Sequence, residues 1–447
     1  MVNEAVPPMA SSGLDRPIGM GGHFMNIFRD DEWLNWRMVP FILIWAAFAV
    51  VLVVWLFMYF FVPEPRKPRP SEKTYTTVDK TGDVTDPEPL PCWYDDLLRR
   101  YYRARQDRPD RTMDMEKDFE PEPAEVFLTL VIPAFNEEDR LSGMLEEAVN
   151  FLQIEYGGGR DSSSSTAMQD IPEHSPAKAD IDAAGARHRK QANGVASNSN
   201  SAHLAGWEIL LIDDGSTDHT LLTAQTFARA HILPPHPRRD SGPWTHRSPQ
   251  GVKIPPGSIR MVSLEENRGK GGAVTHGMRH ARGQYVLFAD ADGASKFSDL
   301  TKLLAACRGI EDAKGRGIAV GSRAHLVGSE AVVKRSRLRN FLMHAFHLLL
   351  WLLTPPATAR IKDTQCGFKL FSRPTLPFII PHMHMEGWIF DVEMLMLAES
   401  AGIPVAEVPV GWREVVGSKL NVVKDSIGMA WGLAILRICW GTGIYRR

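Results

Sequence analysis

Two aspartates, Asp290 and Asp292, stand one residue apart where an apolar run ends, and this spacing allows them to bind a hard divalent cation. The run Tyr285-Val-Leu-Phe-Ala289 is β-branched and aromatic, which predicts a buried strand that ends at the two carboxylates. Mg²⁺ and Mn²⁺ prefer oxygen ligands and typically bridge protein carboxylates to substrate phosphates. An acidic pair at a strand end is also a common turn former, so the tripeptide alone leaves both interpretations open.

Three further polar loops follow predicted strands. The first contains Pro133, Ala134, Asn136 and Glu138, and opens a helix whose amino end faces the same edge of the sheet. The second reads Leu211-Ile-Asp-Asp-Gly-Ser-Thr-Asp218, in which Asp213 can accept hydrogen bonds from a base or a ribose.

The third loop, Asn267-Arg-Gly-Lys-Gly-Gly272, precedes a helix. It offers backbone amides, including that of Gly271, together with Arg268 and Lys270, for phosphate oxygens. Each of the three loops alone also fits ordinary turn chemistry.

The elements that must position these loops alternate between strand and helix. We expect strands over 127–132, 207–212, 259–264, 285–289 and 317–320, and helices over 137–156, 216–230 and 271–281. Such alternation predicts an α/β fold with a mostly parallel sheet flanked by helices and with its ligands at the carboxyl ends of the strands.

An apolar segment near the amino terminus predicts a membrane anchor. Residues 39–62 carry no charge over 24 positions, enough to span a hydrocarbon core of roughly 30 Å. Two arginines precede this segment closely, whereas five basic residues follow it by residue 80, so the positive-inside rule places the large carboxyl-terminal part in the cytosol. The four scattered cysteines agree with a reducing compartment.

The remaining composition limits the partners. Lys plus Arg number 51 and Asp plus Glu 53, so no overall charge argues for nucleic acid. Residues 157–205 are rich in Gly, Ser, Ala and Asn and are interpreted as a disordered insertion. Residues 233–258 are interpreted as a second, shorter surface loop. We expect both insertions to lie away from the catalytic edge.

In this order, the four loops resemble those of the family 2 glycosyltransferases with the GT-A fold. The resemblance covers roughly residues 127–409. It implies that Asp290 and Asp292 hold Mg²⁺ or Mn²⁺ on the diphosphate of a sugar nucleotide. It further implies a nucleotide pocket that contains Pro133, Ala134, Asn136, Glu138, Asp213 and Asp214.

The second half of the chain points to a lipid acceptor. A basic cluster leads directly into the apolar run 341–353, which suits an anionic head group with an apolar tail. Arg323, Arg335 and Arg337 are the candidates for the acceptor phosphate. A buried core helix with a solvated basic start is the alternative. Residues 426–441 form a second candidate surface helix.

Two later blocks, Asp363-Thr-Gln-Cys-Gly-Phe-Lys-Leu-Phe371 and Glu386-Gly-Trp-Ile-Phe-Asp-Val-Glu393, narrow the resemblance to the dolichyl-phosphate β-glucosyltransferases. That family implies inverting transfer of glucose from UDP-glucose to dolichyl phosphate for protein N-glycosylation. It also implies a single-pass protein of the endoplasmic reticulum membrane with a cytosolic catalytic domain. Alternatives are GDP-mannose as donor, another polyprenyl phosphate as acceptor, and a non-catalytic nucleotide-sugar-binding membrane subunit.

The acceptor's chemistry bears on Asp391, which stands roughly where hydroxyl-transferring relatives carry their base. A phosphate monoester with a second pKa of about 6 is largely dianionic at neutral pH and needs no strong base. Asp391 is therefore expected to orient the acceptor or to order its loop.

These expectations define five regions. They are a lumenal tail (1–38), the transmembrane helix (39–62), a stalk and membrane-proximal segment (63–125), the GT-A domain (126–412) and an amphipathic membrane-associated segment (413–447). Protein partners and oligomeric state are not predicted.

Overall fold

The computed structural model describes residues 38–62, 64–108, 121–157, 204–233, 244, 252–326, 337–415 and 422–445. The chain divides into two compact units, Met1–Val62 and Pro63–Arg447. In the first unit, α1 (Val39–Phe61) is an apolar helix, and among the described residues it alone is long and apolar enough to cross a membrane. Almost all of the expected insertion 157–205 lies outside the described residues.

A seven-stranded sheet forms the centre of the second unit, with the strand order β5-β4-β3-β6-β8-β7-β9. Every neighbouring pair is parallel except the two that involve β8, which runs antiparallel to β6 and β7. The expected mostly parallel sheet of a GT-A fold is thereby confirmed. The strands are β3 (Val126–Ala134), β4 (Trp207–Asp213), β5 (Ile259–Ser263), β6 (Gly283–Ala289), β7 (Ile318–Ser322), β8 (Phe368–Ser372) and β9 (Val405–Pro409).

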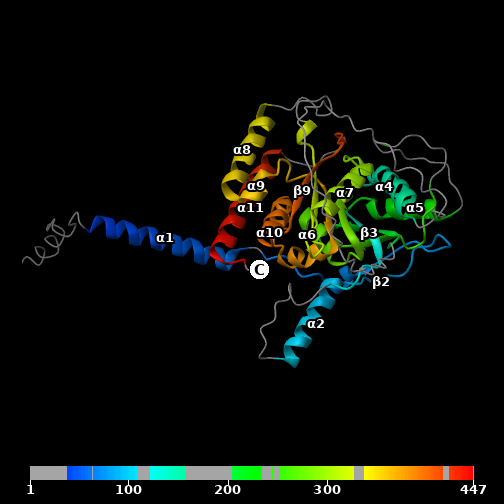
Figure 1. Ribbon diagram of the computed structural model, residues 1–447, viewed down its shortest axis with the longest axis horizontal. Helices are drawn as coiled ribbons and strands as arrows, with labels where there is room; N and C mark the ends of the chain where they lie inside the picture. The colour runs from blue at the N-terminus through cyan, green and yellow to red at the C-terminus, as the bar shows by residue number, and fades with distance from the viewer. Residues whose placement is uncertain are drawn as a thin grey trace, which may run out of the picture. The chain divides into compact units, whose positions relative to one another are not determined.

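Alternate residues of the central strands bury themselves in two different cores, because successive side chains point to opposite faces. Leu128, Leu130 and Ile132 of β3 pack in one core, whereas Val131 packs in the other. The first core contains residues of α4 (Leu141–Tyr156), α5 (Thr220–Ile232) and α7 (Leu300–Ile310). The second contains residues of α2 (Trp93–Asp107), α6 (Gly269–Arg279) and α10 (Phe390–Ser400). Helices thus cover both faces of the sheet (Figure 1).

The segment before β3 packs against the seven-stranded sheet and its helices. A short helix η1 (Pro70–Lys73) leads into a two-stranded sheet of β1 (Thr74–Tyr75) and β2 (Glu88–Pro89). Thr76 bridges to Met261 of β5, and the indole nitrogen of Trp93 donates to the Met278 carbonyl at 2.7 Å. The expected stalk is therefore part of the same compact unit as the sheet.

Three helices at the end of the chain group beside the sheet (Figure 1). They are α8 (Arg337–Leu353), α9 (Pro356–Arg360) and α11 (Val422–Thr442), and α8 contacts both of the others. Leu348, Trp351 and Leu352 of α8 are exposed, as are Ile427 and Trp431 of α11. These exposed apolar residues of two helices that contact each other are called here the α8/α11 face.

Candidate functional site

A cleft of about 400 Å³ opens at the carboxyl ends of β3, β4 and β6, where parallel strands deliver their loops to one edge. Six residues of the predicted site line it together: Pro133, Ala134, Asp214, Lys270, Asp290 and Asp292. The other lining residues are Phe135, Glu137, Arg140, Asn267, Gly269, Ala273, Ala291, Gly387, Trp388 and Asp425. The sequence-based prediction therefore located the cleft and part of its wall.

Each aspartate of the Asp290-Ala-Asp292 motif has a cation beside it. Lys270 Nζ lies 2.6 Å from Asp290 Oδ1, and Arg140 Nη1 lies 3.8 Å from Asp292 Oδ2. Burial, together with repulsion from Asp290, raises the pKa of Asp292. Burial opposes the charge on Lys270, but Asp290 and Asp391 outweigh it and raise the lysine pKa. The site thus concentrates negative charge, and Lys270 and Arg140 compensate part of it.

The two carboxylates fit a metal that also binds a diphosphate. Among the described residues, no three His, Cys, Asp or Glu side chains gather as a complete protein-only metal site. Mg²⁺ commonly takes one or two carboxylates and completes its coordination with substrate phosphates and water. Asp290 and Asp292 supply that donor set, and the repulsion between them is what a divalent cation would relieve.

The first two strand-end loops are locked together by hydrogen bonds. Asn136 has a φ of 55°, a left-handed conformation that asparagine tolerates. Its side-chain Oδ1 accepts from the Thr217 backbone amide at 2.7 Å, and its backbone amide donates to Ser216 Oγ at 2.9 Å. Glu138 accepts from the His219 amide at 2.9 Å. The structure therefore gives Asn136 and Glu138 the task of joining the loops.

Asp213 and Asp214 are both buried at the end of β4. Asp213 accepts from the Ser216 amide at 3.3 Å, and Asp214 Oδ1 accepts from the Arg268 amide at 2.7 Å. Burial raises the pKa of Asp214 to about 7, although the amides of Arg268 and Gly269 oppose this effect. Asp214 thus joins the second loop to the third at the floor of the cleft.

Arg268 differs from the expected phosphate ligand. Its guanidinium is buried and donates to Glu386 Oε1 at 2.9 and 2.5 Å and to the Arg66 carbonyl at 2.6 Å. Packing also explains the glycine at position 271, since a Cβ there would lie 2.5 Å from Phe390 Cβ. Of the third loop's three candidates, only Lys270 lines the cleft.

Asp391 forms a fully buried ion pair with Lys369, whose Nζ also donates to the Cys366 carbonyl at 2.8 Å. Burial raises the pKa of Asp391, and Lys369 opposes that effect. Glu393, two residues further along α10, accepts from the amides of His384 and Met385. These contacts favour ordering of the loop, the second of the two roles expected for Asp391.

The acceptor candidates are only partly described. Arg323 makes a bidentate pair with Asp363, at 2.7 Å from Nε to Oδ2 and 2.8 Å from Nη2 to Oδ1. Burial disfavours its charge, but Asp363 outweighs this and raises its pKa. Arg335 lies outside the described residues, and Arg337 begins α8 with its side chain outside them.

Comparison with known proteins shows where this site belongs. The model of the family Glycosyl transferase family 2 matches residues 195–347. The chain is 36% identical to a dolichyl-phosphate beta-glucosyltransferase of Saccharomyces cerevisiae, over 89% of this chain and 92% of the relative. It is 32% identical to the Homo sapiens protein of the same name, over 71% of this chain and 77% of that protein.

The chain belongs to the dolichyl-phosphate beta-glucosyltransferase family.

Solved structures extend the comparison. Glucosyl-3-phosphoglycerate synthase from Mycobacterium tuberculosis matches with a TM-score of 0.39 and 16% identity, over 70% of this chain and 80% of that one. The same synthase has been crystallised with Mn²⁺ and UDP-glucose.

Arg140 and Trp388 are among the residues of the glycosyltransferase cleft that sequence analysis missed. Arg140, which faces Asp292, also pairs with Glu137 at 2.6 Å. Trp388 is partly exposed, and its ring lies 5.7 Å from Lys270 Nζ. Neither residue belongs to a strand-end motif. The i, i+3 spacing of Glu137 and Arg140 at a helix start does predict an ion pair there.

The expectation that residues 233–258 lie away from the catalytic edge is wrong for Trp244. Its amide donates to Glu147 at 2.6 Å, and its indole nitrogen donates to the carbonyl of Ala294 at 3.4 Å. The guanidinium of Arg413 lies 4.3 Å from the indole ring. Trp244 therefore contacts the loop that follows Asp292.

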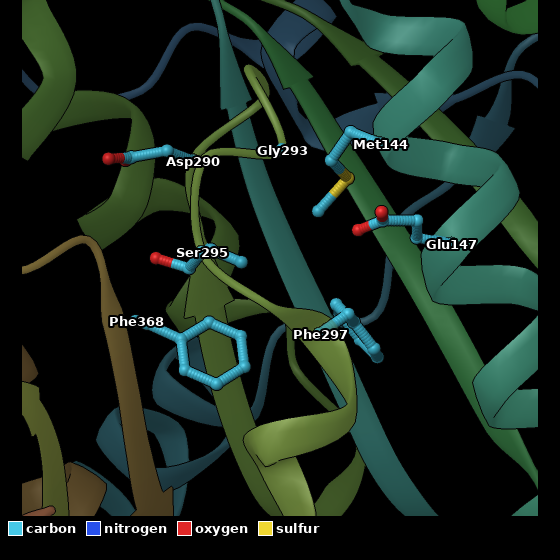
Figure 2. Close-up of a pocket in the computed structure, with 8 residues that line it drawn as sticks. Met144, Glu147, Asp290, Gly293, Ser295, Phe297 and Phe368 are labelled. Atoms are coloured by element: carbon cyan, nitrogen blue, oxygen red, sulfur yellow. The ribbon is translucent and has the colours of Figure 1, made fainter. Parts of the chain in front are cut away.

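A small cavity lies beneath that loop. Figure 2 shows Met144 and Glu147 projecting from α4 toward the segment of Gly293 and Ser295, while the Asp290 side chain points away from α4. Burial raises the pKa of Glu147 to about 7. The loop that carries the two aspartates is thus supported from α4 and from Trp244.

Proposed function

We propose that this chain transfers glucose from UDP-glucose to dolichyl phosphate at the cytosolic face of the endoplasmic reticulum membrane. The observation that carries the proposal is the convergence of Asp290, Asp292, Lys270 and Arg140 in one cleft of a family member. Paired carboxylates with flanking cations suit a metal-bound nucleoside diphosphate.

The donor lies with its diphosphate toward Asp290 and Asp292 and its nucleoside toward the loops of Ala134 and Asp214. Asp290 and Asp292 would hold Mg²⁺ or Mn²⁺, which would supply positive charge against the charge that develops on the departing diphosphate. Lys270 and Arg140 add fixed positive charge at the same edge. Preorganised charge of this kind stabilises a transition state without reorganisation at the moment of reaction.

The acceptor phosphate attacks the anomeric carbon in line with the departing diphosphate and inverts its configuration. The phosphate is already largely dianionic at neutral pH, because its second pKa is about 6. No side chain has to remove a proton from it. A buried Asp391 paired with Lys369 is compatible with this chemistry.

The dolichyl chain lies on the α8/α11 face. Leu348, Trp351, Ile427 and Trp431 expose apolar surface there, and Asp425 of the same α11 lines the cleft. Exposed apolar patches of this kind mark contacts with lipid or protein. We expect Trp351→Glu to raise the KM for dolichyl phosphate and to leave the KM for UDP-glucose unchanged.

The apolar helix α1 anchors the protein in the membrane as a single span. Basic residues at 66, 67, 69, 73 and 80 follow it, which supports a cytosolic second unit. Protease protection of sealed microsomes tests this orientation: residues 64–447 should be degraded without detergent. Protection of that part would reverse the topology.

The reaction is tested with the full chain in detergent, UDP-glucose and a short dolichyl phosphate. We expect Asp290→Asn and Asp292→Asn each to lower transfer by about 10²–10³-fold, since metal stabilisation of the transition state amounts to several kcal/mol. Asp86→Asn, at an exposed carboxylate of the β1–β2 segment, is the matched control. Undiminished transfer by either variant would remove the metal role.

The donor is tested by replacing UDP-glucose with GDP-mannose at equal concentration. We expect transfer of glucose and little transfer of mannose. Equal or faster transfer of mannose would overturn the assignment of the sugar.

A further inference from the structure

The segment that follows α1 contacts a loop of the cleft. Residues 64–73, called here the strap, run along the loop of residues 264–270. Glu72 of the strap is fully buried, and its Oε1 accepts from the Glu265 amide at 3.1 Å. The same carboxylate accepts from the Arg69 amide at 2.8 Å and from Arg66 Nη2 at 2.5 Å. Every one of these contacts is with the strap itself or with the cleft loop.

A second contact joins the strap to α6. His276 Nε2 lies 2.8 Å from the Glu72 carbonyl, and as the carbonyl can only accept, the imidazole donates. His276 is also buried. Glu72 therefore holds the first residues of the loop through its side chain and the helix behind the loop through its backbone.

The strap also reaches the opposite wall of the cleft through Arg268. That guanidinium donates to the Arg66 carbonyl of the strap and to Glu386, which precedes the cleft residues Gly387 and Trp388. The Glu386 carbonyl accepts from the Gly272 amide at 3.1 Å. Strap, loop 264–270 and turn 385–390 thus form one connected set of hydrogen bonds.

Burial of a carboxylate is costly unless its hydrogen bonds and charge are satisfied. Two backbone amides and one guanidinium meet that need for Glu72, and they hold its pKa below the usual value although burial acts in the opposite direction. Removing the negative charge would leave Arg66 without its partner and would weaken the hold on the Glu265 amide.

We propose that Glu72 is a positioning residue for the sugar-nucleotide donor. By fixing the backbone of Glu265 and, through Arg66, the guanidinium of Arg268, the strap sets the spacing between loop 264–270 and turn 385–390. These two segments contribute Asn267, Gly269 and Lys270 on one wall and Gly387 and Trp388 on the other. The inference rests on the proposed function, because it assigns this cleft to the donor.

The test uses the full chain in detergent and compares Glu72→Gln with Asp86→Asn. The control also replaces a carboxylate by an amide, at an exposed position between β1 and β2. We expect Glu72→Gln to weaken UDP binding, measured by calorimetry, and to raise the KM for UDP-glucose, each by about tenfold, as for loss of a charged hydrogen bond. The KM for dolichyl phosphate should stay within about twofold of the wild type, because the described hydrogen bonds of Glu72 go to the strap, to the Glu265 amide and to His276 of α6. Asp86→Asn should match the wild type.

Unchanged UDP binding by Glu72→Gln, or an equal rise of both KM values, would overturn the positioning role. A variant that does not fold is replaced by Arg66→Ala, which leaves Glu72 with its two backbone donors. The same donor-selective loss is expected, and an absent or unselective effect would count against the proposal. Should the wild type fail to bind UDP, the proposed donor is wrong. The dissociation constants of Glu72→Gln and the wild type are then compared for the nucleotide that the wild type does bind. Their ratio still decides the role of Glu72.

Discussion

The carboxylate of Asp290 rests on the bare backbone of Gly367. A Cβ at Gly367 would lie 2.1 Å from Asp290 Oδ2, and the Asp290 amide donates to the Gly367 carbonyl at 3.1 Å. Gly367 directly precedes β8, whose Phe368 is paired with Ala289 of β6. The antiparallel strand β8 therefore fixes where the Asp290 carboxylate points.

Gly367→Ala should lower transfer on the order of a hundredfold, because a displacement of about 1 Å in a reacting group can cost that much. The concentration of Mn²⁺ that gives half-maximal rate should rise as well. Gly309→Ala is the matched control, since it lies at the exposed end of α7 with no atom within 4 Å of its added Cβ. Full activity of Gly367→Ala across the Mn²⁺ titration would show that Asp290 can move without loss.

Lys369→Met should destabilise the fold by about 3–5 kcal/mol, because it leaves Asp391 as an unpaired buried charge. The double variant Lys369→Met with Asp391→Leu should recover much of that loss. Chemical denaturation of the purified protein measures both. Additive losses in the double variant would show that the two side chains are not coupled.

Asp391→Asn should reduce activity without changing the shape of the pH–rate profile. The reason is that a dianionic acceptor phosphate needs no general base. Loss of the acidic limb of kcat against pH in this variant would instead identify Asp391 as a base.

Trp244→Ala should lower activity several-fold and raise the Mn²⁺ requirement, because Trp244 contacts Ala294, two residues after Asp292. Trp244→Phe keeps a ring for Arg413 but not the indole donor, so it should restore part of the loss. Leu222→Ala, at an exposed apolar residue of α5, provides the comparison. If Trp244→Ala has the wild-type Mn²⁺ requirement, the loop does not depend on this contact.

Stability should fall as the solution is acidified below neutrality, because His280 is buried as the neutral base. Burial lowers its pKa from 6.5 to about 4. The unfolded chain therefore binds the proton first, and up to about 3 kcal/mol is lost as pH falls from 6.5 to 4. His280→Asn, which can still donate to the Pro91 carbonyl, should flatten this dependence in thermal unfolding, whereas His325→Asn at an exposed site should not. Equal slopes for all three proteins would contradict the assignment.

The strands were predictable where apolar residues run without interruption. β3, β4 and β6 are nearly all apolar and buried on both faces, which is the pattern of a central parallel strand. β8 was not predicted, because Lys369 stands in its middle and nothing local indicates that Asp391 neutralises it 22 residues later. Its antiparallel direction depends on the path of the chain between β7 and β8, which periodicity does not encode.

The site, like the fold, was predictable only where the local sequence carries the information. Motifs at strand ends located Lys270, Asp290 and Asp292, because strand direction alone brings such residues to one edge. Arg268 was predicted as a phosphate ligand because its partner Glu386, which lies 118 residues away in the chain, could not be inferred from the local sequence. A charged residue's partner is a property of tertiary packing, so the sequence supplied candidate cations and could not say which of them is already paired.

The strap also decides where a soluble version of the enzyme can start. A fragment that begins at β3, where the strand pattern starts, would lack Glu72 and would leave the Glu265 amide and the Arg268 guanidinium without these partners. It would also lose Trp93, whose indole fills the second core and donates to the Met278 carbonyl. The cut that removes the anchor and keeps the enzyme whole lies in the few residues between the end of α1 and Arg66.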